Sequence, residues 1–259
     1  MEVVMLESPA RVADVAAGIV ARALRTLPEP TIGLATGSSP LATYRELIET
    51  HRRGDLSFSG ATAVMLDEYV GLPPDHPESY RMVIRRELVD HVDLPLDRLH
   101  SPDVRNDDIA AECARYDRLV TRLAVDVQLL GIGSDGHIGF NEPSSSLASR
   151  TRIKTLTEET RADNARFFDA AEDVPRHVVT QGLGTISDAR HLVMIATGSS
   201  KAHPIAAAVE GPLSAMCPAS ILQLHPHVTV LVDEDAGAEL QLADYYRQTY
   251  RHKPPWQPL

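Results

Sequence analysis

The run VDVQLLGIG at residues 125–133 decides the fold, because it is an apolar stretch that ends directly in a glycine-rich segment. Consecutive Val and Leu residues suit a strand that is covered on both faces, as in a parallel sheet. Similar apolar runs recur along the chain, and we expect each of them to form a buried strand. They are TIGLA at 31–35, ATAVMLD at 61–67, HLVMIATG at 191–198 and HVTVLVD at 227–233.

Stretches with helical spacing of apolar residues separate these runs. They lie at residues 10–26, 41–53, 107–124 and 200–210. Such alternation predicts the α/β class, with a mostly parallel twisted sheet covered by helices on both faces. Because no low-complexity linker divides the chain, we expect a single domain over residues 1–259, with excursions at 91–103 and 142–157.

The composition excludes several classes of protein. Hydrophobic residues make up 43% and charged residues 24% of the chain, which is typical of a globular protein, and no stretch reaches the ~18 apolar residues of a membrane span. The net charge of -11 argues against nucleic-acid binding, which needs a basic face. Cys113 and Cys217 form no C-x-x-C pattern, and the N-terminal residues show neither the basic n-region nor the long apolar h-region of a signal peptide. We therefore expect a cytoplasmic protein with no membrane partner.

The sequence ATGSS occurs twice, at 35–39 and 196–200, each time after a predicted strand and before a predicted helix. In the first copy, the backbone N–H groups and hydroxyls of Thr36, Gly37, Ser38 and Ser39 can hold an anion, although an ordinary turn with a helix cap has the same composition. Lys201 follows the second copy, where a cation opposes the helix dipole unless an anion binds nearby. The two loops can thus converge on one phosphate.

Two acidic residues, Asp67 and Glu68, end the second predicted strand in the sequence LDEYVGLP. Ligands of open α/β sheets bind beyond the carboxyl ends of the strands, so one of these residues is a candidate general base. Helix capping or a surface ion pair explains the pattern equally well.

The segment GIGSDGHIGFNEP at 131–143 is the densest in chemistry-bearing residues. It contains G-x-G-x-x-G, but the glycine and proline that follow exclude the helix that a dinucleotide site requires. Asp135 and Glu142 place two carboxylates around His137, an arrangement that fixes a histidine tautomer and allows proton transfer. A single histidine makes a poor metal site, so we expect no metal. The basic residues of 150–168 are expected to be mostly solvated, with one or two available as anion contacts.

Several motifs together resemble the glucosamine-6-phosphate deaminase family, and they span most of the chain from about residue 30 to 240. They are LDEYVGL at 66–72, HPESY at 76–80, GIGSDGHIGFNEP at 131–143, SSLASRTRIKTLT at 145–157, TGSSKA at 197–202 and LQLHP at 222–226. The resemblance implies a Rossmann-like enzyme that converts D-glucosamine 6-phosphate and water to D-fructose 6-phosphate and ammonia. It also implies that neither a metal nor an organic cofactor takes part.

The resemblance further implies a role for each candidate residue. Asp67 would move the C2 proton during aldose–ketose isomerisation. His137 would open the pyranose ring, oriented by Asp135 and Glu142. The phosphate would lie between the loop of Thr36 to Ser39 on one side and Arg166 and Lys201 on the other.

Many bacterial members of this family are homo-hexamers activated by N-acetylglucosamine 6-phosphate, so the resemblance implies a homo-oligomer and an allosteric site. The matching positions are Ser145, Arg152, Lys154 and Thr155. Two alternatives are a 6-phosphogluconolactonase-like hydrolase and a non-catalytic sugar-phosphate sensor. The first does not usually show the full set of motifs, and the second would need a DNA-binding extension that the sequence lacks.

Overall fold

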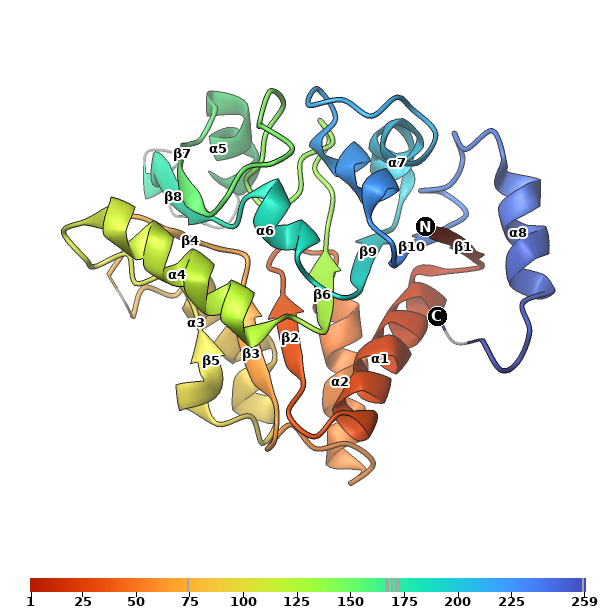
Figure 1. Cartoon of the computed structure of the whole chain (residues 1–259), viewed down its shortest axis with the longest axis horizontal. Helices are drawn as coiled ribbons and strands as arrows, with labels where there is room; N and C mark the ends of the chain where they lie inside the picture. Colours follow the sequence, from red (N-terminus) through yellow and green to blue (C-terminus); the bar gives the residue numbers. More distant parts are fainter. Residues whose placement is uncertain (74, 166–167, 169, 171–172, 258) are drawn as a thin grey trace.

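Seven parallel strands form the main sheet of the protein (Figure 1). The computed structural model describes residues 1–259 except 74, 166–167, 169, 171–172 and 258, and it does not describe the side chains of 159 and 163. The strand order is β1-β10-β9-β6-β2-β3-β5, and every neighbouring pair is parallel. Their bounds are β1 Glu2–Leu6, β2 Thr31–Leu34, β3 Thr62–Met65, β5 Leu99–His100, β6 Val127–Leu130, β9 Leu192–Ala196 and β10 Val228–Asp233. Each predicted apolar run contains one of these strands, so the predicted α/β class with a mostly parallel sheet is confirmed.

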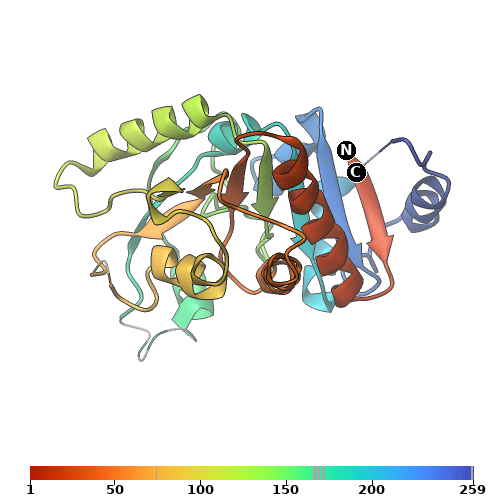
Figure 2. The same ribbon diagram turned by 90° about the horizontal axis from the view of Figure 1, so that it is seen from below.

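Helices cover both faces of this sheet (Figure 2). One face packs against α1 (Pro9–Thr26), α2 (Leu41–Arg52) and α3 (Tyr80–Glu87). The other packs against α4 (Ile109–Leu123), α6 (Leu183–Ser187), α7 (Ala202–Val209) and the 3₁₀ helix η6 (Pro218–Leu224). Short 3₁₀ helices also occur at η1 (Val89–His91), η2 (Leu96–Arg98) and η5 (Ser199–Lys201), and α8 (Ala243–Arg251) lies beside β1. No helix in the described part of the chain is long and apolar enough to cross a membrane.

The strands are buried on both faces because their side chains alternate between two apolar cores. In β10, for example, Leu231 joins the core under α1 and α2, whereas Val230 and Val232 join the core under α4 and α7. This explains why the strands read as continuous apolar runs in the sequence.

A second, antiparallel sheet with the order β4-β8-β7 lies above the main sheet in Figure 1. It consists of β4 (Asp67–Tyr69), β8 (His177–Thr180) and β7 (Arg152–Thr155), and α5 (Glu158–Asn164) follows β7. The segment expected to be an excursion at 142–157 therefore contributes an ordered strand. The chain enters this sheet directly after β3, so β4 stands at the carboxyl end of the main sheet.

The main sheet reverses its direction of growth between β2 and β6. From β2 the chain adds β3 and β5 on one side, and it then returns to place β6 on the other side of β2. The loops that follow β2 and β6 therefore diverge and leave a crevice between them, which is where ligands bind in sheets of this type.

Candidate active site

A cavity of about 360 Å³ occupies this crevice. It is lined by the loops that follow β2, β3 and β6, together with residues of α3, α5 and η5. Its walls include Asp67, His137 and Lys201, so most of the residues predicted from three distant parts of the sequence meet in one place.

The two ATGSS loops meet at this cavity, as their repetition predicted. Residues 36–39 line it from the first loop, and Ser200 and Lys201 line it from the second. Both loops turn through a glycine with positive φ, +84° at Gly37 and +85° at Gly198, which a residue with a side chain rarely adopts. The Lys201 ammonium donates a hydrogen bond of 2.7 Å to the carbonyl oxygen of Ile132, in the loop after β6.

Asp67 is buried at the start of β4, with 5% of its surface exposed, and its side chain borders the cavity. Burial, and after it the charge of Glu68, raises the pKa of Asp67 to about 8. Such a carboxylate is far more basic than one in water, which suits it to abstract a proton from carbon. The alternative of helix capping applies to its neighbour instead, because Glu68 accepts hydrogen bonds from the backbone of Tyr80 and Arg81 at the start of α3.

Asp135 and His137 form a close pair on the rim of the cavity. The Asp135 carboxylate lies 2.6 Å from Nδ1 of His137 and also accepts the His137 backbone N–H at 3.1 Å. Burial opposes the charge of Asp135, but the hydrogen bonds and charge of His137 outweigh it and hold the pKa of Asp135 below its ordinary value. Gly133 makes room for the imidazole, since a Cβ there would lie 2.2 Å from the ring. The pair therefore presents Nε2 as the atom available for proton transfer.

Glu142 does not complete a pair of acids around His137, contrary to the sequence-based expectation. The chain folds back through the bridge between Ile138 and Asn141, which directs Glu142 toward α5. There its buried carboxylate accepts hydrogen bonds from the hydroxyls of Thr157 at 3.2 Å and Thr160 at 2.6 Å. Within the described part of the chain the structure records no hydrogen bond between Glu142 and His137. Glu142 instead fixes the first turn of α5, which borders the cavity through Thr160.

The residues expected at an allosteric site lie on β7 and on the loop before it. Ser145 is buried, and its hydroxyl has no hydrogen-bond partner among the described residues. Arg152 donates a hydrogen bond of 2.8 Å to the side chain of Asn141, the neighbour of Glu142. Lys154 and Thr155 follow on β7, and Thr155 is exposed. Arg166, expected at the phosphate, lies outside the described residues.

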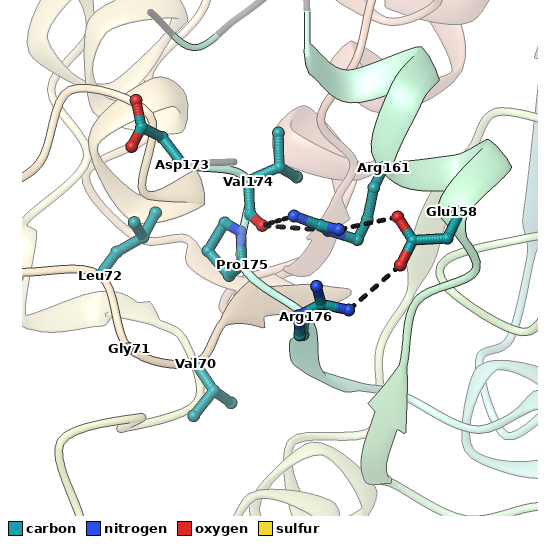
Figure 3. A pocket seen from close by; sticks show the side chains of 9 residues that line it. All are labelled: Val70, Gly71, Leu72, Glu158, Arg161, Asp173, Val174, Pro175 and Arg176. Carbon is teal, nitrogen blue, oxygen red and sulfur yellow. Dashed lines mark hydrogen bonds and ion pairs between the residues drawn. The ribbon is translucent and has the colours of Figure 1, made fainter. Parts of the chain in front are cut away.

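Arg161 is buried, although most basic residues of 150–168 were expected to be solvated. Its buried guanidinium donates to the carbonyl oxygen of Val174 and pairs with Glu158 at 2.9 Å (Figure 3). These residues line a second cavity of about 490 Å³, and a third of about 510 Å³ lies beside α3. Both are larger than the cavity in the crevice, but neither is lined by Asp67, His137 or Lys201. The candidate active site is therefore the crevice.

Tyr80 and Thr160 also line this cavity, although sequence reasoning gave neither a role. The Tyr80 hydroxyl donates a hydrogen bond of 3.3 Å to the hydroxyl of Tyr69. The motif HPESY, which ends at Tyr80, was the available signal. Among the described residues, no group of three or more His, Cys, Asp or Glu side chains is placed to hold a metal ion.

Fold and site together define an α/β enzyme that acts on a small anionic substrate at the carboxyl end of a parallel sheet. Residues 7–231 match the family described as glucosamine-6-phosphate isomerases/6-phosphogluconolactonase, and the chain belongs to that family. Within it, the chain is 62% identical over 258 residues to the glucosamine-6-phosphate deaminase of Rhodococcus jostii, covering 99% of both chains. It is 55% identical over 259 residues to that of Streptomyces coelicolor, again covering 99% of both.

Solved structures agree with this placement. A structure described as a monomeric glucosamine-6-phosphate deaminase superposes with a TM-score of 0.90 at 42% identity, covering 92% of this chain and 100% of that one. The 6-phosphogluconolactonase of Trypanosoma brucei superposes with a TM-score of 0.70 at 19% identity, covering 92% and 98% of the two chains, which shows a shared fold alone.

Proposed function

We propose that the chain is a glucosamine-6-phosphate deaminase, which converts D-glucosamine 6-phosphate and water to D-fructose 6-phosphate and ammonia. The observation that carries the proposal is the meeting of a buried Asp67 with a raised pKa, His137 and the two ATGSS loops in one cavity. The deaminases of the same family, at 55–62% identity over nearly the whole chain, support it.

The residues divide the reaction between them. The phosphate binds between residues 36–39 and Lys201, with Arg166 as a further expected contact. His137, oriented by Asp135, transfers the proton that opens the pyranose ring. Asp67 then moves the C2 proton, which gives an enolamine and, after protonation, an imine. Water adds to the imine carbon, and ammonia leaves as fructose 6-phosphate forms.

Glu142 acts in this scheme through α5 rather than through the imidazole. Its bonds to Thr157 and Thr160 keep the first turn of α5 at the cavity wall.

We also propose a regulatory site for N-acetylglucosamine 6-phosphate at Ser145, Arg152, Lys154 and Thr155, in a homo-oligomer such as a hexamer. The link from Arg152 to Asn141, beside Glu142, supports a route from this site to the active site. The related solved deaminase is described as monomeric, so the mass of this protein in solution has to be measured by light scattering. A cytoplasmic role in amino-sugar catabolism fits a phosphorylated substrate and the free thiols of Cys113 and Cys217.

One assay tests the proposed function. Purified, metal-stripped protein is incubated with glucosamine 6-phosphate, with and without N-acetylglucosamine 6-phosphate, and ammonia and fructose 6-phosphate are measured separately. Equal amounts of both products are expected. Hydrolysis of 6-phosphogluconolactone without any ammonia from the amino sugar would instead favour the lactonase alternative.

A further inference from the structure

Glu68 is a buried carboxylate that the proposed chemistry does not use. Only 4% of its surface is exposed, and it directly follows Asp67 on β4. Side chains of consecutive strand residues point to opposite faces. Accordingly, Asp67 lines the catalytic cavity, whereas Glu68 lines the separate cavity beside α3.

Three backbone N–H groups donate to the Glu68 carboxylate. One oxygen accepts the N–H of Tyr69 at 2.9 Å and that of Tyr80 at 2.8 Å, and the other accepts the N–H of Arg81 at 2.9 Å. Tyr80 and Arg81 are the first two residues of α3, whose N-terminal N–H groups have no partner within the helix. Ser79 caps the same helix from its own side chain. Glu68 therefore ties the start of α3 to the strand that carries Asp67.

Through Tyr80, the contact between Glu68 and α3 also affects the catalytic cavity, which residues 36–39 line from the opposite loop. The ring of Tyr80 stacks on Phe140, with 6° between the ring planes, and Tyr80 and Thr36 line the same cavity. A shift of the start of α3 would thus move a wall of the cavity between Thr36 and Asp67.

The charge of Glu68 acts on Asp67 as well. Burial raises the pKa of Glu68 above its ordinary value, although the three N–H donors and the charge of Arg81 limit that rise. A negative charge beside Asp67 disfavours ionisation of Asp67, and it is the second cause of its raised pKa after burial.

We propose that Glu68 is a positioning residue for the reaction: it fixes Tyr80 at the wall of the catalytic cavity, and its negative charge acts directly on the Asp67 carboxylate. This inference rests on the proposed deaminase function for its kinetic part. Substituting Glu68 separates its two contributions. Glu68→Gln removes the charge but keeps the length of the side chain, whereas Glu68→Asp keeps the charge but cannot reach all three N–H groups.

The first measurement is the pH profile of kcat/KM for ammonia release. In Glu68→Gln, the midpoint of the acidic limb should fall by about one pH unit, because a like charge next to the base is gone. In Glu68→Asp, the midpoint should stay near that of the wild type, while kcat/KM falls at least about tenfold, because α3 and Tyr80 are displaced.

The second measurement does not depend on activity. The carboxyl carbon of Asp67 is titrated by ¹³C NMR, with Asp67→Asn as the assignment control, and Glu68→Gln should lower the Asp67 midpoint by the same amount. Other groups that act on or face Asp67 are Tyr69, Tyr80 and Tyr116, and His137 and Lys201 around the cavity. None of them is substituted in either variant, and Glu68→Gln, which keeps the length of the side chain, is the variant used to follow the Asp67 midpoint. If the wild type releases no ammonia, the deaminase proposal fails, and this titration still decides the role of Glu68.

Glu112→Gln is the matched control for loss of a buried carboxylate. Glu112 is 1% exposed and accepts a backbone N–H from Asp103 at 2.7 Å, but it lies on α4 and does not line the catalytic cavity. It should lower the melting temperature without moving the Asp67 midpoint. An unchanged midpoint in Glu68→Gln, or wild-type kcat/KM in Glu68→Asp, would overturn the proposal.

Discussion

The ammonium group of Lys201 donates a hydrogen bond of 2.7 Å to the carbonyl oxygen of Ile132, which joins the loop after β9 to the loop after β6. These loops come from neighbouring strands of the main sheet, and both border the catalytic cavity. The contact therefore places a positive charge at the cavity wall in a protein whose net charge is -11. Among the described residues that line the cavity, Lys201 is the only lysine or arginine, so its loss should be poorly compensated.

Replacing Lys201 by Ala should raise KM for glucosamine 6-phosphate by about 10- to 100-fold, the loss expected when a charged group no longer binds phosphate. The effect on kcat should be smaller. Steady-state kinetics of the variant measure both. Lys253→Ala is the control, because Lys253 pairs with Glu2 and does not line the cavity. Equal KM values in the two variants would remove Lys201 from the phosphate site.

Asp67→Asn should lower kcat by about 10²- to 10⁴-fold, the usual contribution of a positioned general base. The fold should persist, since an amide of the same shape replaces the buried acid. Retained exchange of the C2 proton with deuterated solvent in this variant would show that another residue is the base.

The same substitution should change the stability with a defined dependence on pH. The pKa of Asp67 is about 8 in the folded protein, above the value of about 3.9 expected when unfolded, so its contribution to folding is lost as the pH rises from 4 toward 8. Asp67→Asn removes this loss. Its melting temperature relative to the wild type should therefore increase between pH 5 and pH 8, which a series of thermal melts can measure. A constant difference across that range would show that Asp67 titrates normally.

Asp135→Asn should lower kcat by about 10²-fold with little change in KM, because Asp135 holds His137 in one tautomer and stabilises its protonated form. Asp103→Asn, at a more exposed carboxylate beside Arg105, should leave kcat unchanged. If Asp135→Asn raises KM and spares kcat, the Asp135–His137 pair contributes to binding rather than to proton transfer.

The main sheet could be predicted because its strands are buried on both faces and therefore appear as unbroken apolar runs. The small antiparallel sheet carries no such signal. Residues Arg152–Thr155 of β7 alternate between half-buried and exposed side chains, and β4 is only three residues long. Their pairing with β8 depends on contacts between distant segments, which local patterns do not encode.

In the candidate site, too, contacts between residues close in the sequence could be predicted, whereas contacts between distant segments could not. Asp135 and His137 are two residues apart, so their contact followed from the sequence. Glu142 was placed beside them for the same reason, but a turn of the chain directs it to Thr160 on α5. The role of Glu68 depends on where α3 begins in space. The Ser79 cap can be recognised in the sequence, but the acid that meets the other N–H groups of the helix cannot.

His191 provides a test of acid stability far from the active site, at the opposite end of β9. Its buried ring stacks on that of His227, with centroids 3.6 Å apart, and Nε2 lies 2.9 Å from the Thr229 hydroxyl. Burial, followed by the charges of His227, Arg22 and His225, lowers the pKa of His191 to about 3.

Between about pH 3 and pH 6.5, His191 is therefore protonated in the unfolded chain but neutral in the folded chain. Because the unfolded state binds the additional proton, lowering the pH within this range favours unfolding. One such proton makes the free energy of unfolding fall by about 1.4 kcal/mol per pH unit. His191→Phe should reduce that slope in urea titrations between pH 6 and pH 4.5, whereas His203→Gln, at an exposed histidine, should not. Parallel slopes for His191→Phe and the wild type would show that the buried imidazole accepts its proton without cost to folding.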